Sequence, residues 1–224
     1  MTEVSIEKII RSKRKTLGLE VTRDAQLIIR APEKISLGAI KRIVFKKQVW
    51  IKNKQVEVRK RHKHTEPKEF VSGEGFLYLG DTYKLEFVDS VKEPIIFDKS
   101  FKISRKYLNH AKKILIDWYK ARAIEKITER VKWYAYLSGI QYNIIKITNA
   151  KKRWGSCGAK GSLNFSWRLI MAPLKALDYV VIHEISHLAE RNHSRNFWNK
   201  IKILMPDYEK YKYWLKENEH LLII

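Results

Sequence analysis

An α+β fold with one long helix is predicted by three features of the amino-acid sequence. Strand-like alternation of β-branched and leucine residues, broken by turn-forming dipeptides, recurs within residues 1–100. A helical repeat of apolar residues then covers residues 104–137, with no internal glycine or proline. Two more strand-like segments and a helix with apolar flanks follow. We therefore predict a β-rich, basic N-terminal region, 1–100, and a core, 101–224, built from a long helix, a small sheet and a second helix.

The first elements of the N-terminal region are a hairpin and a helix. Residues 15–21 and 26–30 resemble strands, and the polar residues between them predict a turn. Ser36 can cap the helix that follows. The apolar residues of this helix recur at helical spacing: Leu37, Ile40, Ile43, Val44 and Val49.

A charged segment and a second hairpin complete the region. Residues 52–68 end in Thr65-Glu66-Pro67, which predicts a loop at their end. Strands are expected at 75–79 and 82–88, joined across Gly80-Asp81.

The core begins with the long helix, which Gly139 terminates. Strands are expected at 144–148 and 163–170. Pro173 suits the first turn of the next helix. A helical tail is expected over residues 194–219, with an interruption at Pro206.

Composition places the chain among soluble, unexported proteins. Its 224 residues include 45% hydrophobic residues, enough to build a core. No stretch approaches the roughly 20 apolar residues of a membrane span, and the start carries no apolar run of signal length. Cys157 is the only cysteine, which excludes an intramolecular disulfide and fits a reducing compartment. We expect a cytoplasmic protein without a membrane partner.

The net charge of +22 has two interpretations. A strongly basic surface attracts polyanions, so a nucleic acid or a nucleotide is one expected partner. The excess, however, is mostly lysine spread along the chain, without the arginine clusters typical of phosphate recognition. A solvated lysine surface explains the charge equally well.

The segment His183-Glu184-Ile185-Ser186-His187 has the pattern H-E-x-x-H within an apolar helical run. On a helix, residues four apart lie about 6 Å apart along the axis on nearly one face, so both imidazoles can reach one ion. Glu184 is turned away from that line and can meet a water molecule on the ion as its base. We predict a Zn²⁺ site here, although histidine sites also accept other divalent ions such as Ni²⁺.

A third ligand is needed, and His193 is the best candidate. It follows His187 by six residues, so the helix must end near Glu190 and the chain must turn back. Asn192 tolerates the left-handed conformation that such a turn would use.

The segment before this helix predicts a substrate surface. From residue 163 onward alternate residues are apolar, so one strand face can pack on the metal-binding helix. Asn164, Ser166 and Arg168 would then point outward, and the free backbone edge could pair with an extended substrate. For the donor that stabilises the oxyanion, the alternatives are Arg153, Arg168, Tyr208 and Tyr211.

Four motifs together resemble the YgjP-like metal-dependent hydrolases. They begin with Arg153-Trp154-Gly155-Ser156-Cys157, continue with residues 164–173 and the H-E-x-x-H segment, and end at residues 193–198. The resemblance implies a zincin-like metallopeptidase core, distantly similar to the SprT-like proteases. It also implies that His183, His187 and His193 are the ligands and Glu184 the base. Glu190 stands where the metzincin pattern has glycine, so no metzincin assignment follows.

The leading functional hypothesis is an enzyme: a zinc-dependent metallopeptidase that cleaves peptides or proteins. Zinc would lower the pKa of a bound water molecule, and Glu184 would take its proton and return it to the leaving amine. One alternative is a metal-dependent hydrolase of nucleoside triphosphates, although no P-loop is present. Another is a nucleic-acid-associated protease or binding module.

Overall fold

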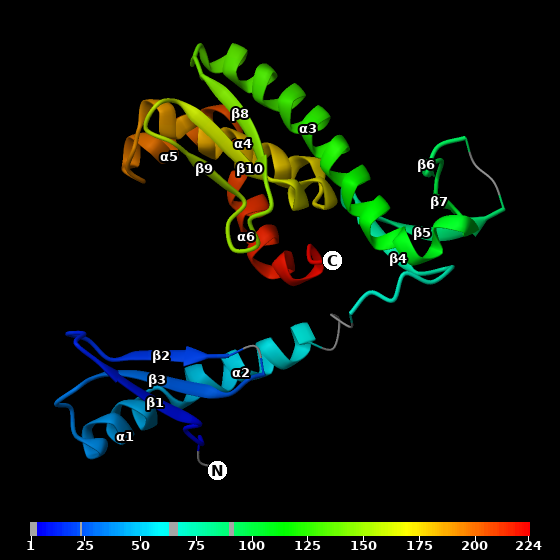
Figure 1. Cartoon of the computed structure of the whole chain (residues 1–224). Coiled ribbons are helices and arrows are strands. Elements are labelled where there is room, and N and C mark those ends of the chain that lie inside the picture. Colours follow the sequence, from blue (N-terminus) through cyan, green and yellow to red (C-terminus); the bar gives the residue numbers. More distant parts are fainter. Residues whose placement is uncertain (1–3, 23, 63–66, 90–91) are drawn as a thin grey trace. The chain divides into compact units, whose positions relative to one another are not determined.

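The structure is a computed structural model that describes residues 4–22, 24–62, 67–89 and 92–224. Contacts divide the chain into two compact units, Met1–Pro67 and Lys68–Ile224 (Figure 1). The boundary predicted after residue 100 therefore lies inside the second unit. The reason is that the strands between residues 75 and 104 share one apolar core with the long helix.

The first unit is a small sheet covered by helices. Its elements are β1 (Lys8–Ser12), β2 (Gly18–Val21), β3 (Leu27–Pro32), α1 (Leu37–Lys46) and α2 (Gln48–His62). The strand order is β1-β3-β2, with β3 parallel to β1 and antiparallel to β2. The antiparallel pair confirms the first predicted hairpin. Leu27 and Ile29 of β3 pack with Ile40 of α1 and Ile51 of α2, all fully buried.

The predicted helix after Pro32 is confirmed with one difference. Ser36 caps α1, because its side-chain oxygen accepts a hydrogen bond from the Ala39 backbone N–H at 3.2 Å. The helix ends at Lys46, with Lys47 as its C-cap, so Val49 lies on α2, where it is exposed. The charged segment continues as helix to residue 62, and Thr65 and Glu66 of the predicted loop lie outside the described residues.

The second unit contains two sheets, one long helix and several shorter helices. Its strands are β4 (Gly75–Tyr78), β5 (Asp81–Val88), β6 (Ile95–Phe97), β7 (Phe101–Ser104), β8 (Ile144–Thr148), β9 (Gly155–Cys157) and β10 (Ser162–Ser166). Its helices are η1 (Arg105–His110), α3 (Ala111–Ser138), η2 (Trp167–Met171), α4 (Leu174–Ala189), α5 (Arg195–Leu204), α6 (Tyr208–Asn218) and η3 (Glu219–Leu221). The predicted α+β class is therefore confirmed.

The first of these sheets, in the order β4-β5-β7-β6, contains the second predicted hairpin. Its turn lies at Leu79-Gly80, one residue before the predicted Gly80-Asp81, because Asp81 already pairs with Tyr78 at the start of β5. Leu79 and Gly80 at its turn both have positive φ, 50° and 96°, as a tight two-residue hairpin turn requires. Their backbone N–H groups donate to the carbonyls of Ile170 and Met171. A side chain at residue 80 would lie 2.9 Å from Pro173, so glycine permits this close packing next to the start of α4.

The long helix α3 holds the remaining elements in place. It ends at Gly139, whose φ of 67° confirms the predicted stop. It packs against η2 and α4. Tyr119 is fully buried, and its hydroxyl donates to the Leu77 carbonyl at 2.6 Å, which connects α3 to the first sheet.

The second sheet has the order β8-β10-β9, so β10 is its central strand. The strand predicted at 163–170 ends at Ser166 and continues as the 3-10 helix η2. Every residue from 165 to 172 is buried, so this segment lacks the exposed face that its apolar alternation predicted. In the described part of the chain, no helix is long and apolar enough to span a membrane.

Candidate metal centre

The H-E-x-x-H segment forms the last two turns of α4, in the interior of the second unit. Leu177, Val181 and Ile185 on this helix are fully buried. The helix is anchored by Asp178, which accepts two hydrogen bonds from Arg130 of α3, at 2.6 Å and 3.0 Å. Apolar packing and this ion pair together determine where the two histidines of α4 point.

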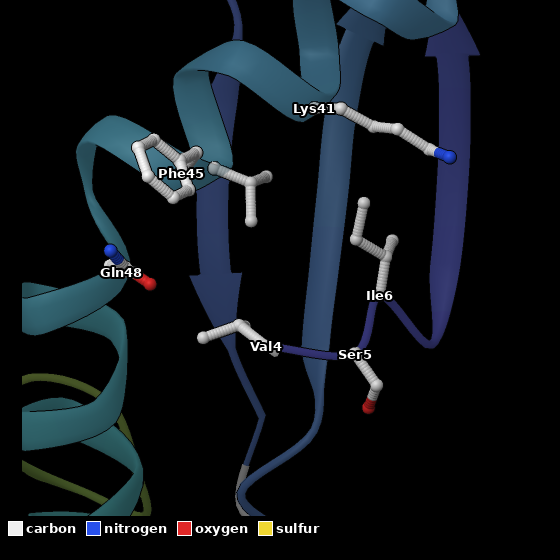
Figure 2. Close-up of a pocket in the computed structure, with 7 residues that line it drawn as sticks. Val4, Ser5, Ile6, Lys41, Phe45 and Gln48 are labelled. Carbon is white, nitrogen blue, oxygen red and sulfur yellow. The ribbon is translucent and has the colours of Figure 1, made fainter. Parts of the chain in front are cut away.

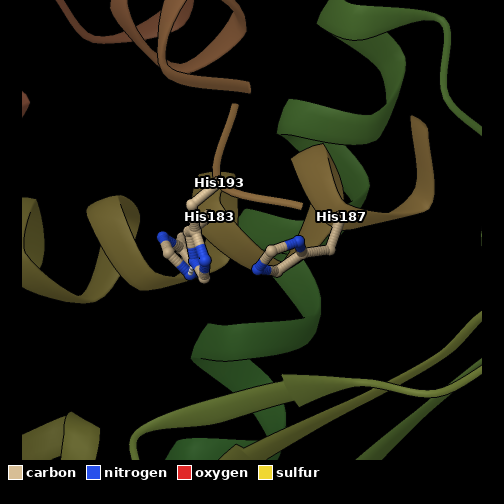
Figure 3. A group of neighbouring side chains, drawn as sticks. All are labelled: His183, His187 and His193. Carbon is tan, nitrogen blue, oxygen red and sulfur yellow. Dashed lines mark hydrogen bonds between the residues drawn. The ribbon is translucent and has the colours of Figure 1, made fainter. Parts of the chain in front are cut away.

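The structure brings the three predicted histidines together. Figure 3 shows His183 and His187 on one helix and His193 on the segment that follows it. One ring nitrogen from each lies within 4.8 Å of the others. The Nε2 atoms of His183 and His193 are 3.2 Å apart. Two nitrogens that bind one tetrahedral zinc at 2.0–2.1 Å lie about 3.4 Å apart, so this donor set fits a single divalent ion.

Burial favours the neutral form of two of these histidines, and a neutral imidazole is the form that binds a metal. Burial, assisted by the neighbouring His187 and His193, lowers the pKa of His183 to about 3. Burial also lowers the pKa of His193. The Nδ1 atom of His187 lies 3.1 Å from the Glu190 carbonyl oxygen, so a proton on Nδ1 leaves Nε2 free to coordinate.

Glu184 is 5% exposed and points toward strand β9. Burial raises the pKa of its carboxyl group to about 7, while the positive charge of Arg153 lowers it. The backbone of Gly155 in β9 comes so close that a Cβ atom there would lie 2.6 Å from Glu184 Cγ. Gly155 thus makes room for the carboxylate, a role that the sequence analysis did not assign.

Two aromatic residues of α5 pack against the three histidines. Phe197 is fully buried, and its ring centre lies 4.5 Å from that of His187 and 5.0 Å from that of His183. Trp198 stacks on His193 at 5.7 Å, and Lys212 Nζ lies 4.2 Å from the centre of the Trp198 ring. These contacts hold His193 in place, and they depend on a helix packing that spacing along the chain does not reveal.

The turn between His187 and His193 differs from the expected one. The described residues with positive φ do not include Asn192, so the predicted left-handed turn at this residue is wrong. Glu190 ends α4 in an extended conformation, and the Ser194 N–H donates to the Asn192 carbonyl at 2.7 Å. Arg191 donates to the Ala159 carbonyl at 2.9 Å, which supports the loop from the side of the second sheet.

The predicted substrate surface on residues 163–169 needs correction. Strand β10 has a neighbour on each side, so it offers no free edge. Ser166 and Arg168 are buried, and they donate to Ala150 and Asn149 respectively. Asn164 donates to the Ser156 carbonyl in β9 at 3.2 Å. The side chains of Ser166 and Arg168 point inward because both faces of residues 165–172 are covered.

Among the residues predicted to stabilise the oxyanion, Arg153 lies next to the site. It is exposed, precedes β9 and acts electrostatically on Glu184. Tyr208 stacks on Trp198 at 5.5 Å. Lys212, which the sequence analysis did not single out, contributes to lowering the pKa of His183 and His193.

A mixed α/β fold with three convergent histidines on and after an H-E-x-x-H helix is an arrangement expected of a metallopeptidase. Residues 15–218 match the YgjP-like family, described as YgjP-like, metallopeptidase domain. The chain belongs to this family, which confirms the predicted resemblance.

Comparison with solved structures finds the metallopeptidase zymogen of Pyrococcus abyssi abylysin. The two chains are 17% identical, with a TM-score of 0.38, and the match covers 41% of this chain and 93% of that chain. No curated protein matches the sequence.

Proposed function

We propose that this chain is a zinc-dependent peptidase in which His183, His187 and His193 hold the ion and Glu184 is the catalytic base. The observation that carries the proposal is the convergence of three imidazoles next to a buried carboxyl group. Three histidine ligands are typical of catalytic zinc, whereas structural zinc takes four protein ligands, often cysteines. A zinc ion held there supplies a Lewis acid that acidifies water and polarises a substrate carbonyl.

Glu184 moves the proton in the proposed reaction. Its carboxylate accepts a proton from the attacking water molecule and delivers it to the nitrogen of the leaving amine. A pKa of about 7 suits a group that must both accept and donate a proton near neutral pH. The positive charges of Arg153, which acts on Glu184, and of Lys212, which acts on His183, support the negative charge that develops on the substrate oxygen.

The substrate in this proposal is an extended peptide that adds to β9. This strand is at the edge of its sheet and pairs with β10 on one side. Gly155 brings its backbone against Glu184. Backbone pairing gives affinity with little sequence preference. The test is a series of peptides that each carry one backbone N-methyl group, moved along the chain one residue at a time. Turnover should fall when every second residue is methylated and stay the same for the residues between them, because every second N–H of a paired strand faces its neighbour. Equal loss at every position would argue against pairing with β9.

The central experiment measures cleavage of an unfolded protein with and without a chelator. Activity should disappear with the chelator and return with added Zn²⁺. Glu184→Gln should keep metal affinity but lower kcat by roughly 10²- to 10⁴-fold. His193→Ala should weaken metal binding itself, and His110→Ala, at an exposed histidine of η1, serves as the control.

Two outcomes would reject the proposal. The first is metal-independent cleavage, or full activity in Glu184→Gln. The second is chelator-sensitive release of phosphate from nucleoside triphosphates by a protein that leaves peptides intact.

A further inference from the structure

The first compact unit carries a larger share of the positive net charge than its share of the chain length. Residues 1–67 carry 18 of the 46 lysine and arginine residues but only 7 of the 24 acidic ones. This unit therefore holds +11 of the formal net charge of +22. Between Glu33 and Glu57 the chain has seven basic residues and no acidic one. A helix pair of this composition attracts polyanions.

The basic side chains of α1 are available for such a partner. Lys41, Arg42, Lys46 and Lys47 are all exposed on α1 or directly after it. Within the described residues of this unit, ion pairs join Glu20 to Arg30 and Glu57 to Lys54 instead. The charges of α1 and its C-cap are therefore not neutralised by a described acidic side chain.

A pocket of about 310 Å³, lined in part by Lys41, lies between α1 and the segment before β1. Figure 2 shows Lys41, Phe45 and Gln48 around the stretch that carries Val4, Ser5 and Ile6. The side chains that line the pocket are mainly apolar. Lys41 adds an ammonium group and Gln48 adds an amide. Phe45 is 70% exposed, although it lines the pocket. A flat, partly polar ligand would cover this ring.

We propose that the first unit binds single-stranded nucleic acid, with one unpaired base in this pocket and phosphates on Arg42, Lys46 and Lys47. Aromatic rings stack on bases, and amides bind base edges, once the bases are free of a partner strand. Trp50, 48% exposed near the start of α2, supplies a second ring. The inference does not rest on the proposed peptidase activity.

Other polyanions fit these observations less well. The phosphates of a duplex would use the same charges, but its paired bases could not stack on Phe45 or enter the pocket. An acidic protein segment would also complement the positive charge of this surface. Its carboxylates would pair with the basic side chains, but they would not cover the exposed ring of Phe45 or fill the mainly apolar pocket.

The first test is fluorescence anisotropy of the full chain with labelled oligothymidylate and with a duplex of equal length. The single strand should bind more tightly. Phe45→Ala should weaken its binding roughly tenfold, as the loss of one stacked base predicts. Leu37→Ala is the matched control, because Leu37 is 58% exposed on the same helix but does not line the pocket. Equal binding of strand and duplex, or equal effects of the two variants, would overturn the proposal.

The second test separates this surface from the general charge of the protein. A triple variant, Arg42→Gln, Lys46→Gln and Lys47→Gln, should reduce the slope of log affinity against log salt by about 2. The control removes three exposed charges of the second unit, at Lys113, Lys132 and Lys202. This control should change the slope much less. The same slope in both variants would contradict the assignment. So would displacement of the labelled oligothymidylate by polyglutamate as effectively as by a single-stranded nucleic acid. Peptidase activity, measured in parallel, reports separately on the metal centre.

Discussion

At the scale of single residues, the reactivity of the second unit depends on the carboxyl group of Glu184. Only its ionised form can accept a proton from water. Burial raises its pKa to about 7, and both the charge of Arg153 and a cation bound by the histidines act in the opposite direction. We expect kcat/KM to rise with pH along an acidic limb whose midpoint lies at or below pH 7. A rate that falls as pH rises through this range would contradict the base role.

Arg153→Ala tests the charge next to this group. Without the positive charge the pKa of Glu184 should rise, so the acidic limb of the pH profile should move to higher pH. Lys152→Ala, at the exposed neighbouring residue, is the control. A profile that stays in place or moves to lower pH would show that Arg153 does not act on Glu184.

Gly155→Ala tests the close approach of β9 to Glu184. The added Cβ atom would lie 2.6 Å from the Glu184 side chain, so the carboxylate must shift. Because misplacement by about 1 Å can cost 10²-fold in rate, we expect kcat to fall by about that factor while zinc affinity is kept. Gly38→Ala is the control, since a Cβ there meets nothing within 4 Å. Unchanged kcat would show that Glu184 tolerates the displacement.

At the scale of elements, the position of α4 depends on its contacts with α3. Asp178 is 1% exposed and forms its ion pair with Arg130 across the two helices. Asp178→Ala leaves the arginine partly buried without a partner. We expect the free energy of unfolding to fall by about 3 kcal/mol, measured by urea denaturation. Asp117→Ala removes an exposed pair with Lys120 and should cost about 0.5 kcal/mol or less. Equal losses in both variants would argue against a special anchoring role.

At the scale of the whole molecule, each compact unit has its own apolar core. We therefore expect a fragment of residues 68–224 to fold and to keep zinc binding and peptide cleavage. It should lose the affinity for oligothymidylate that the full chain shows. Circular dichroism, metal titration and anisotropy measure the three properties. An unfolded fragment would show that the second unit requires the first.

Much of the fold could be predicted from local patterns. The antiparallel hairpins, the Ser36 cap and the end of the long helix at Gly139 depend on residues that are neighbours in the chain. The spacing of apolar residues and the residue types found in turns therefore predict these features directly. The prediction for residues 163–170 went wrong because both sides of this segment are buried. An alternating apolar pattern does not distinguish a surface strand from a covered one.

The candidate site could be predicted from the sequence alone, because residue type and helical spacing decide which donor atoms share a face. The sequence identified His183, His187 and His193 as possible ligands and Glu184 as their neighbour. Three features became visible only in the folded chain: α5 packs against His193, Gly155 leaves room for the Glu184 carboxylate, and β9 lies at the edge of its sheet. These arrangements join segments far apart in the chain, and their geometry follows from the packing of the whole core.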